Sequence, residues 1–227
     1  MFDDFDNKYA PRTLDDMVFR SEADKTVLEG CITGSTGFPA GGKNGILLYG
    51  PVGTGKSELG KNIPRMIERT RGGDDPHITY YNVSSGDNGG KLIEAIKRQA
   101  ELVSAFQLFH YFVLDEVDNL KSGEPMKSLK VAMNINPRGT IFVFTTNNLP
   151  DIDAGVQSRS VLIPIVAAPP QHWLPRVRKI FEDYGVDESD AWILQMLDMC
   201  NGDGRQITAQ IRSRIATRLG YSIPIVV

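Results

Sequence analysis

One eight-residue stretch constrains the fold of this chain more than any other. Residues 50–57 read Gly-Pro-Val-Gly-Thr-Gly-Lys-Ser and match the phosphate-binding pattern G-x-x-x-x-G-K-[ST] at every position. Its glycines let the backbone turn tightly, so that successive N–H groups point at phosphate oxygens. Lys56 would supply a positive charge for the outer phosphates, and the Ser57 hydroxyl would ligate Mg²⁺. The stretch predicts a site for a nucleoside triphosphate and Mg²⁺.

The segments on either side of the motif have the patterns that it requires. Residues 45–49 form a short apolar run that is typical of a buried strand. Residues 58–71 repeat apolar side chains at helical spacing, namely Leu59, Ile63, Met66 and Ile67. A helix that begins directly after the loop points the positive end of its dipole at a bound anion. The order strand, loop, helix favours a phosphate-binding unit over a glycine-rich turn that matches by chance.

Two carboxylates directly follow the strand predicted at residues 111–114. In a nucleotide site of this kind, Asp115 would hold the Mg²⁺ shell, through water, and Glu116 would polarise the attacking water. An acidic pair after a strand is also typical of a solvated loop. The phosphate-binding motif upstream favours the catalytic interpretation.

A third apolar strand, predicted at residues 140–146, ends at two asparagines. A polar amide at this strand end, from Asn147 or Asn148, would orient a water molecule beside the terminal phosphate. The alternative is an Asx turn that merely closes the strand. The sequence pattern at this point leaves both interpretations open.

Strand and helix patterns alternate along most of the chain, which predicts an α/β fold with a parallel sheet covered on both faces. Strands are expected at 45–49, 78–83, 111–114, 140–146 and 161–166, and helices at 22–29, 58–71, 91–106 and 122–133. In such sheets, ligands bind at the carboxyl ends of the strands. The phosphate-binding motif, the carboxylates and the asparagines all follow strands directly, so we expect them at one edge.

The run Ala167-Ala168-Pro169-Pro170 interrupts this alternation, and all that follows has helical patterns. Helices are predicted at 173–184, from 187 onward and at 205–219, the last with isoleucines at period four. We therefore expect two domains, a nucleotide-binding core of residues 1–168 and a small helical domain of residues 169–227.

Composition excludes several other classes of protein. The two cysteines of the 227-residue chain are far apart and its three histidines are scattered, so neither forms a metal-ligand or catalytic pattern. No apolar run is long enough to cross a bilayer, and the acidic N-terminus does not resemble a secretion signal. We expect a cytoplasmic protein with reduced thiols. Because the net charge is −3, any contact with nucleic acid must come from a local basic patch.

Together these motifs resemble the AAA+ ATPases, and among them the clamp-loader clade, which includes replication factor C small subunits and their phage counterparts. The resemblance covers nearly the whole chain. It implies a P-loop NTPase fold, a three-layer sandwich around a parallel sheet followed by an all-helical lid. It also implies ATP as the nucleotide, Mg²⁺ as the metal, and hydrolysis of ATP to ADP and phosphate.

The resemblance extends to the N-terminal segment Lys8-Tyr9-Ala10-Pro11, which is similar to a lead-in that packs on adenine. The family usually has an arginine where this chain has Ala10, so one contact to the nucleotide or a neighbouring subunit is in doubt. The nucleotide-binding residues implied are Tyr9, Pro11, Gly50, Pro51, Val52, Gly53, Thr54, Gly55, Lys56, Ser57, Glu58 and Asp115. Ser57 and Asp115 are the implied metal ligands.

Further site residues follow from the same resemblance. Asn82, at the end of the second strand, would restrain Glu116, and Asn147 would be sensor 1, with Asn148 as the alternative. Arg159, in the sequence Gln157-Ser158-Arg159-Ser160, is similar to the finger that reaches into a neighbouring subunit's site. The alternative interpretation is that Arg159 forms a salt bridge at the surface.

Arg205, in the sequence Gly202-Asp203-Gly204-Arg205, resembles sensor 2, an arginine of the lid that contacts the γ-phosphate. Its alternative is an arginine at a helix N-terminus that faces solvent. The motifs thus imply Lys56, Asn82, Glu116, Asn147, Arg159 and Arg205 as the residues that carry hydrolysis.

The resemblance implies a homo- or hetero-oligomeric ring or spiral with DNA and a client such as a sliding clamp as partners, and no membrane. Clamp-loader subunits normally continue into a helical collar, whereas the sequence is expected to end with the lid domain, so we expect assembly either through the AAA+ interfaces alone or with a collar from another subunit. Lys91, Lys97, Arg98 or Lys127 would suit DNA phosphates, although each is also typical of a solvated helix face. The alternatives are a helicase-loader or transposition-type regulator and a protein-remodelling ATPase. The loop at residues 84–90 lacks the aromatic residue typical of the latter.

Overall fold

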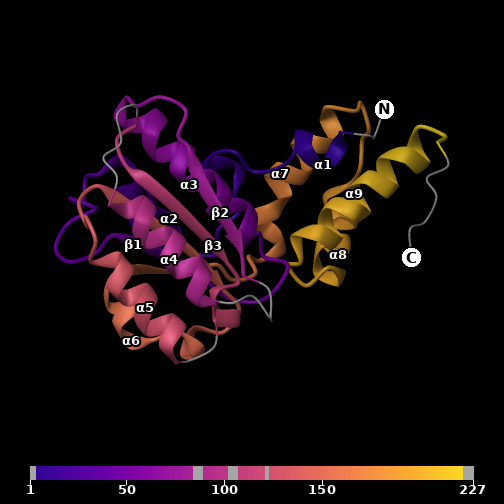
Figure 1. Cartoon of the computed structure of the whole chain (residues 1–227). Helices are drawn as coiled ribbons and strands as arrows, with labels where there is room; N and C mark the ends of the chain where they lie inside the picture. Colours follow the sequence, from indigo (N-terminus) through magenta and orange to yellow (C-terminus); the bar gives the residue numbers. More distant parts are fainter. Residues whose placement is uncertain (1–3, 84–88, 102–106, 121–122, 222–227) are drawn as a thin grey trace. The chain divides into compact units, whose positions relative to one another are not determined.

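The computed structural model describes residues 4–83, 89–101, 107–120 and 123–221, which fall into two compact units (Figure 1). The first, here called the sheet unit, comprises Glu22–Gly50 and Lys56–Ile165. The second, here called the helical unit, comprises Met1–Ser21, Pro51–Gly55 and Val166–Val227. The division at residue 168 stays a prediction about domains; the compact units differ from it because the N-terminal segment and part of the phosphate-binding motif group with the helices.

Five parallel strands form the centre of the sheet unit. They are β1 (Gly45–Tyr49), β2 (Ile78–Asn82), β3 (His110–Asp115), β4 (Thr140–Thr146) and β5 (Ser160–Pro164). Their order is β2-β3-β4-β1-β5, so β1 lies between β4 and β5. This arrangement confirms the predicted α/β fold with a parallel sheet.

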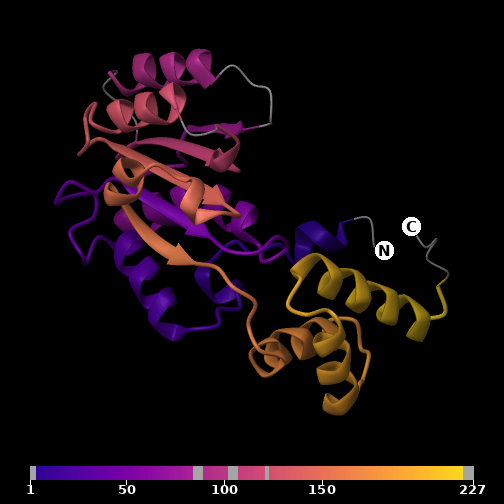
Figure 2. The same ribbon diagram turned by 90° about the horizontal axis from the view of Figure 1, so that it is seen from below.

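Helices cover both faces of this sheet (Figure 2). On one face lie α2 (Glu22–Thr33) and α3 (Lys56–Arg71), and on the other α4 (Gly89–Ala100), α5 (Glu124–Met133) and α6 (Ala154–Ser158). Because side chains alternate along a strand, Phe112, Phe142 and Phe144 share the second face. Their rings stack at centroid distances of 5.2 and 5.8 Å, beneath buried residues of α4 and α5.

Helix α2 extends beyond its predicted end at residue 29. Gly30 does not end the helix; a Cβ there would lie 2.6 Å from the Thr36 side chain, so glycine allows close packing. The helix ends at Thr33, before Gly34, which has a φ of 80° and donates to the Gly30 carbonyl. The sequence pattern therefore predicts the end of this helix four residues too early, at Gly30 instead of Gly34.

Several other predicted boundaries differ from the observed ones by a few residues. Helix α3 begins at Lys56 rather than 58, and α4 at Gly89 rather than 91. The N-terminal part of the chain, for which no helix is predicted before residue 22, contains α1 (Phe5–Lys8) and a 3₁₀ helix, η1 (Leu14–Asp16). Asp16 stabilises the turn by accepting bonds from the Thr13 N–H and hydroxyl at 2.9 and 2.8 Å. This Thr-x-x-Asp signal was present in the sequence.

The helical unit has its own core, formed by α7 (Pro170–Glu182), α8 (Asp190–Met199) and α9 (Gly204–Arg218). The three isoleucines that recur at period four in α9, Ile207, Ile211 and Ile215, are buried in this core. Phe5 of α1 is buried in the same core, which explains why the N-terminal segment groups with these helices. Helix α7 begins at Pro170 rather than 173. The C-terminal tail after Tyr221 and most of the loop at 84–90 lie outside the described residues.

Within the described part of the chain, every helix is too short or too polar to cross a membrane.

Candidate nucleotide-binding site

The carboxyl edge of the sheet brings together the end of β3 and the end of β4. Asp115, the last residue of β3, is only 6% exposed. Its Oδ1 accepts a hydrogen bond from the Thr145 hydroxyl, and its Oδ2 accepts one from the Tyr80 hydroxyl at 2.9 Å. Since hydroxyl donors hold both oxygens, the carboxylate has a defined orientation.

Tyr80 is a site residue that the sequence reasoning missed. It lies on β2 two residues before Asn82, so both side chains lie on the same face of the sheet. Burial, followed by the hydrogen bond to Asp115, raises the pKa of its hydroxyl well above the usual range, so it stays a donor at neutral pH. The Lys61 ammonium of α3 lies 5.2 Å from the ring centroid. The alternation of side chains along β2 could have indicated Tyr80, because it lies on the same face as Asn82.

Glu116 follows Asp115 in an uncommon backbone conformation. Its φ of 55° lies in the left-handed region, where residues other than glycine occur mainly at turns and functional sites. The Glu116 N–H donates to Thr145 Oγ1 at 2.9 Å, so one hydroxyl contacts both members of the acidic pair. The Glu116 side chain is exposed at this edge. Its backbone is thus held in place while its carboxylate faces outward.

A second asparagine, rather than Asn82, contacts the Glu116 carboxylate. Asn82 pairs in register with Asp115, but no hydrogen bond joins its side chain to another described residue. Asn119, in the 3₁₀ helix η2 (Val117–Leu120), donates from Nδ2 to Glu116 Oε2 at 3.3 Å and to the Val83 carbonyl at 2.8 Å. The role of Asn82 stays a prediction. Sequence reasoning missed Asn119, although its spacing of three from Glu116 suits a short helix.

The two asparagines after β4 have different surroundings. Asn148 donates from Nδ2 to Asp151 Oδ2 at 2.6 Å and precedes the 3₁₀ helix η3 (Leu149–Asp151). Asn147 is exposed, and its side chain makes no hydrogen bond with another described residue. The local turn thus occupies Asn148, which leaves Asn147 as the better candidate for contact with a ligand.

The beginning and the end of the phosphate-binding motif lie in the sheet unit. Gly50 has a φ of 146°, and a Cβ there would lie 2.3 Å from the Ile165 carbonyl oxygen, so only glycine fits. Lys56, Ser57 and Glu58 form the first turn of α3, and the Lys56 side chain is 6% exposed. The first turn of a helix presents N–H groups that no intrahelical carbonyl accepts from, which makes a helix start suited to bind an anion.

The middle of the motif, Pro51–Gly55, lies in the helical unit together with the start of α9. The Gly53 carbonyl accepts a hydrogen bond from the Gly204 N–H at 2.8 Å, and a Cβ on Gly53 would lie 2.6 Å from the Asp203 carboxylate. Asp203 caps α9 by accepting from the Arg205 and Gln206 N–H groups. Within the helical unit, the contact thus brings the start of α9, with the exposed Arg205, to residues 51–55 of the motif.

The predicted adenine-contacting residues also lie in the helical unit. The Tyr9 hydroxyl donates to Asp183 Oδ2 at 2.9 Å, and the Tyr9 carbonyl accepts from Arg176 at 2.7 Å. Its ring lies 5.0 Å from that of Phe5. Pro11 follows in the partly buried segment that leads to η1. Tyr9 is therefore anchored to α7 and its C-terminal end.

Arg159, the candidate finger, makes no ion pair with a carboxylate among the residues that the structure describes. Its Nε donates to Asn134 Oδ1 at 2.8 Å, and Nη1 donates to the Gly155 carbonyl at 3.0 Å. Both acceptors are neutral, so the positive charge is not compensated by a contact within the described chain. This arrangement disfavours the alternative of a surface salt bridge.

The residues at the carboxyl edge suit Mg²⁺, which prefers hard oxygen ligands and retains several waters. Asp115 supplies an oriented carboxylate and Ser57 a hydroxyl. Among the described residues, no group of three or more His, Cys, Asp or Glu side chains could hold a metal by itself. A Mg²⁺ ion held by one carboxylate, one hydroxyl and the phosphates of the substrate needs no more protein ligands than Asp115 and Ser57 supply.

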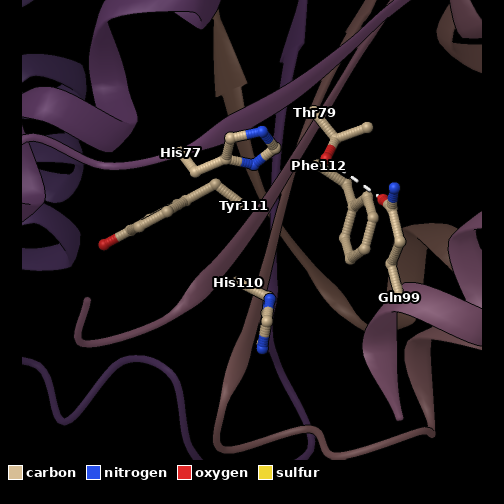
Figure 3. A pocket seen from close by; sticks show the side chains of 6 residues that line it. All are labelled: His77, Thr79, Gln99, His110, Tyr111 and Phe112. Atoms are coloured by element: carbon tan, nitrogen blue, oxygen red, sulfur yellow. Dashed lines mark hydrogen bonds between the residues drawn. The ribbon is translucent and has the colours of Figure 1, made fainter. Parts of the chain in front are cut away.

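A separate pocket lies at the opposite, amino edge of β2 and β3 (Figure 3). Its lining residues are His77, Thr79, Gln99, His110, Tyr111 and Phe112. The Thr79 hydroxyl donates to Gln99 Oε1 at 3.1 Å across it. The lining contains no carboxylate, lysine or arginine, and none of the predicted site residues belongs to it.

The sequence matches the model of one protein family and is similar to several proteins of known identity. The family described as "ATPase family associated with various cellular activities (AAA)" matches residues 46–164. Replication factor C small subunit 2 of Pyrobaculum islandicum is 27% identical over 92% of this chain and 63% of its own length. Replication factor C subunit 4 of Caenorhabditis elegans is 24% identical over 91% of this chain and 61% of its own length. This chain thus spans about three fifths of these relatives.

Solved structures show the same fold at lower identity. The Thermotoga maritima RuvB Holliday junction branch migration motor superposes with a TM-score of 0.71 and is 16% identical. The match covers 94% of this chain and 68% of the motor. At this identity, the similarity shows the fold alone.

Proposed function

The chain belongs to the AAA family of ATPases, and on that basis we propose that it binds ATP with Mg²⁺ and hydrolyses it to ADP and phosphate. We further propose that it acts as a clamp-loader-like, oligomeric switch on DNA during replication. The relatives named replication factor C support the second part. Because the chain spans only part of those relatives, its activity and partners are proposals about this sequence.

The arrangement of Asp115 and Glu116 is the observation that carries the proposed hydrolysis. Asp115 is held by two hydroxyl donors, as a metal-shell ligand should be, while Glu116 exposes its carboxylate one residue later. In this position Glu116 would accept a proton from, or orient, the attacking water. Asn147 would hold the same water from the end of β4.

The phosphate-binding motif supplies the other half of the site. The backbone N–H groups of residues 50–57 would bind the phosphates, and Lys56 would neutralise the outer ones. Ser57 and Asp115 would hold Mg²⁺, which when bound offsets charge that develops on the transferring phosphoryl group. Arg205 would add a second positive charge from α9.

Arg159 supports the oligomeric part of the proposal. Its charge has no carboxylate partner among the described residues, and neutral oxygens hold its side chain. A finger of this kind acts in a neighbouring subunit's site and is worth roughly 10³–10⁵ in rate in well-characterised systems. Turnover would then require assembly.

The decisive experiment measures ATP turnover against protein concentration, with and without primed DNA, for wild type and Arg159→Ala. We expect wild-type turnover to rise with concentration and with DNA, and to fall by at least about 10³-fold in the variant while ATP binding is retained. Arg69→Ala, which removes an exposed arginine from α3, is the matched control and should behave as wild type.

Turnover that is independent of both DNA and Arg159 would contradict the clamp-loader-like role and leave the nucleotide site alone in place. A wild-type protein that binds ATP but never hydrolyses it would contradict the hydrolytic part as well. It would leave ATP binding as the signal, as in a helicase-loader type of regulator.

A further inference from the structure

Glu116 requires a defined position, because a general base must lie within hydrogen-bond reach of the proton that it accepts. The Thr145 hydroxyl holds its backbone N–H, but this contact does not orient the side chain. The exposed carboxylate could rotate freely about the side-chain bonds unless a further group contacts it. The described contacts supply one such group, Asn119.

Asn119 contacts Glu116 at both ends of that residue. The Asn119 N–H donates to the Glu116 carbonyl at 3.0 Å, and its side-chain Nδ2 donates to Glu116 Oε2 at 3.3 Å. The backbone contact closes the turn that places Glu116 in the left-handed conformation. The side-chain contact bridges the carboxylate back to the same turn.

The same amide ties Glu116 to the end of β2. Asn119 Nδ2 also donates to the Val83 carbonyl at 2.8 Å, and the Val83 N–H donates to the Asp115 carbonyl at 3.0 Å. Val83 is 1% exposed, so its backbone position is fixed by burial. Val83, Asp115, Glu116 and Asn119 therefore form one closed set of contacts.

The helix that carries Asn119 is itself anchored. Val117 and Leu120 of η2 are buried in the core beneath α4 and α5. Asn119 lies between them in sequence and is half-buried, so its backbone cannot move without displacing these side chains. A donor on so rigid an element can hold a flexible carboxylate.

We propose that Asn119 is a positioning residue for Glu116, and that its amide couples the orientation of the Glu116 carboxylate to the end of strand β2. This inference rests on the proposed function, in which Glu116 acts on the attacking water. It assigns to Asn119 the restraint that the resemblance assigned to Asn82.

The test compares steady-state ATP turnover and ATP affinity in Asn119→Ala and Asn119→Asp. Asp keeps the shape of Asn but lacks the donor hydrogens and adds a negative charge beside the Glu116 carboxylate, so a loss of turnover in this variant comes from the changed polar contact and not from lost packing. We expect kcat to fall about 10- to 100-fold in both variants, as a misplaced catalytic group predicts, with the dissociation constant for ATP unchanged. The melting temperature should fall by no more than about 4 °C. Asn7→Ala removes an exposed amide that bonds Asp4 in the helical unit and should leave kcat unchanged.

A double-mutant cycle identifies the partner. In a Glu116→Gln background, Asn119→Ala should cause no further loss of turnover, because both changes remove the same function. Independent, multiplicative losses would overturn the inference, as would wild-type kcat in Asn119→Asp. A larger loss in Asn82→Ala than in Asn119→Ala would overturn it too.

Failure of the proposed function has a different signature. If wild type hydrolyses no ATP, or if Glu116→Gln turns over as fast as wild type, the role of Glu116 fails and the inference fails with it. If Glu116→Gln is inactive while Asn119→Ala is fully active, only the inference fails.

Discussion

Thr145 shows how much one hydroxyl can contribute to an acidic site. It donates to Asp115 and accepts from the Glu116 N–H, so the two carboxylate residues share one contact from the neighbouring strand. It is 1% exposed, and its surroundings exclude water that would compete for these bonds. The geometry of the acidic pair therefore depends on β4 as well as on β3.

Tyr80→Phe should raise the Mg²⁺ requirement of the ATPase. The change removes one of the two hydroxyl donors to Asp115 and nothing else. A hydrogen bond to a charged group is worth about 1.5–3 kcal/mol, part of which water can replace at this half-exposed position. We expect the Mg²⁺ concentration for half-maximal turnover to rise about three- to tenfold, with kcat at saturating Mg²⁺ nearly unchanged.

Tyr81→Phe is the control for that experiment. Tyr81 is the next residue of β2, on the opposite face, where it packs against the core beneath α4 and α5. It should leave the Mg²⁺ dependence as in wild type. The same Mg²⁺ dependence in Tyr80→Phe and wild type would mean that Thr145 alone orients Asp115.

Among the secondary-structure elements, the C-terminal end of α2 depends on a side chain from another helix. Arg71, the last residue of α3, donates to the carbonyls of Cys31, Ile32 and Phe38. Two of these carbonyls belong to the last turn of α2, where no intrahelical donor is available. The guanidinium fork thus joins the two helices that cover one face of the sheet.

Arg71→Ala should destabilise the sheet unit by about 2–4 kcal/mol, because it removes several charge-assisted hydrogen bonds and leaves their acceptors unpaired. Urea unfolding followed by circular dichroism measures this change. Arg69→Ala, two residues earlier and exposed, should change the free energy of unfolding by less than about 0.5 kcal/mol. Equal stability of the two variants would show that water replaces the Arg71 contacts.

At the scale of the whole molecule, each of the two units has a hydrophobic core of its own. The core beneath α4 and α5 contains only residues of the sheet unit, and the core of α7–α9 contains only residues of the helical unit. Chains with more than one core commonly unfold in more than one transition. A substitution within one unit should therefore shift one transition more than the other.

Glu188→Gln tests whether the helical unit unfolds in a transition of its own. The destabilisation that this substitution causes should depend on pH. The Glu188 side chain is 3% exposed, and hydrogen bonds from Arg218 and then Arg214 lower its pKa from 4.5 to about 2. A lowered folded-state pKa contributes stability above about pH 4.5, and this contribution is lost as the pH falls towards 2. We expect the variant to be about 1–3 kcal/mol less stable at pH 7.

Differential scanning calorimetry between pH 7 and acid conditions measures both effects. The difference in stability between wild type and Glu188→Gln should shrink as the pH falls below about 4.5. At each pH, the unfolding transition of the sheet unit should lie at the same temperature in both proteins. A difference that is the same at every pH would show that Glu188 contributes by packing rather than by charge.

Residues close together in the chain account for what could be predicted from sequence. The phosphate-binding motif, the five strands and the acidic pair at the end of β3 follow from local spacing and from period-2 and period-3.6 patterns. The rule that parallel strands present ligands at their carboxyl ends then brings β3 and β4 together at one edge. Boundaries shifted by a few residues where two signals competed, as at Gly30 and Gly34.

The partners of the site residues depended on the tertiary structure. The bond from Tyr80 to Asp115 spans 35 residues and that from Thr145 spans 30, so only strand register decides them. The choice of Asn119 over Asn82 as the contact of Glu116 depends on how far each amide reaches, which no spacing rule specifies. Phe5 likewise joins the core of α7–α9 through contacts with residues far along the chain, which no local sequence pattern specifies.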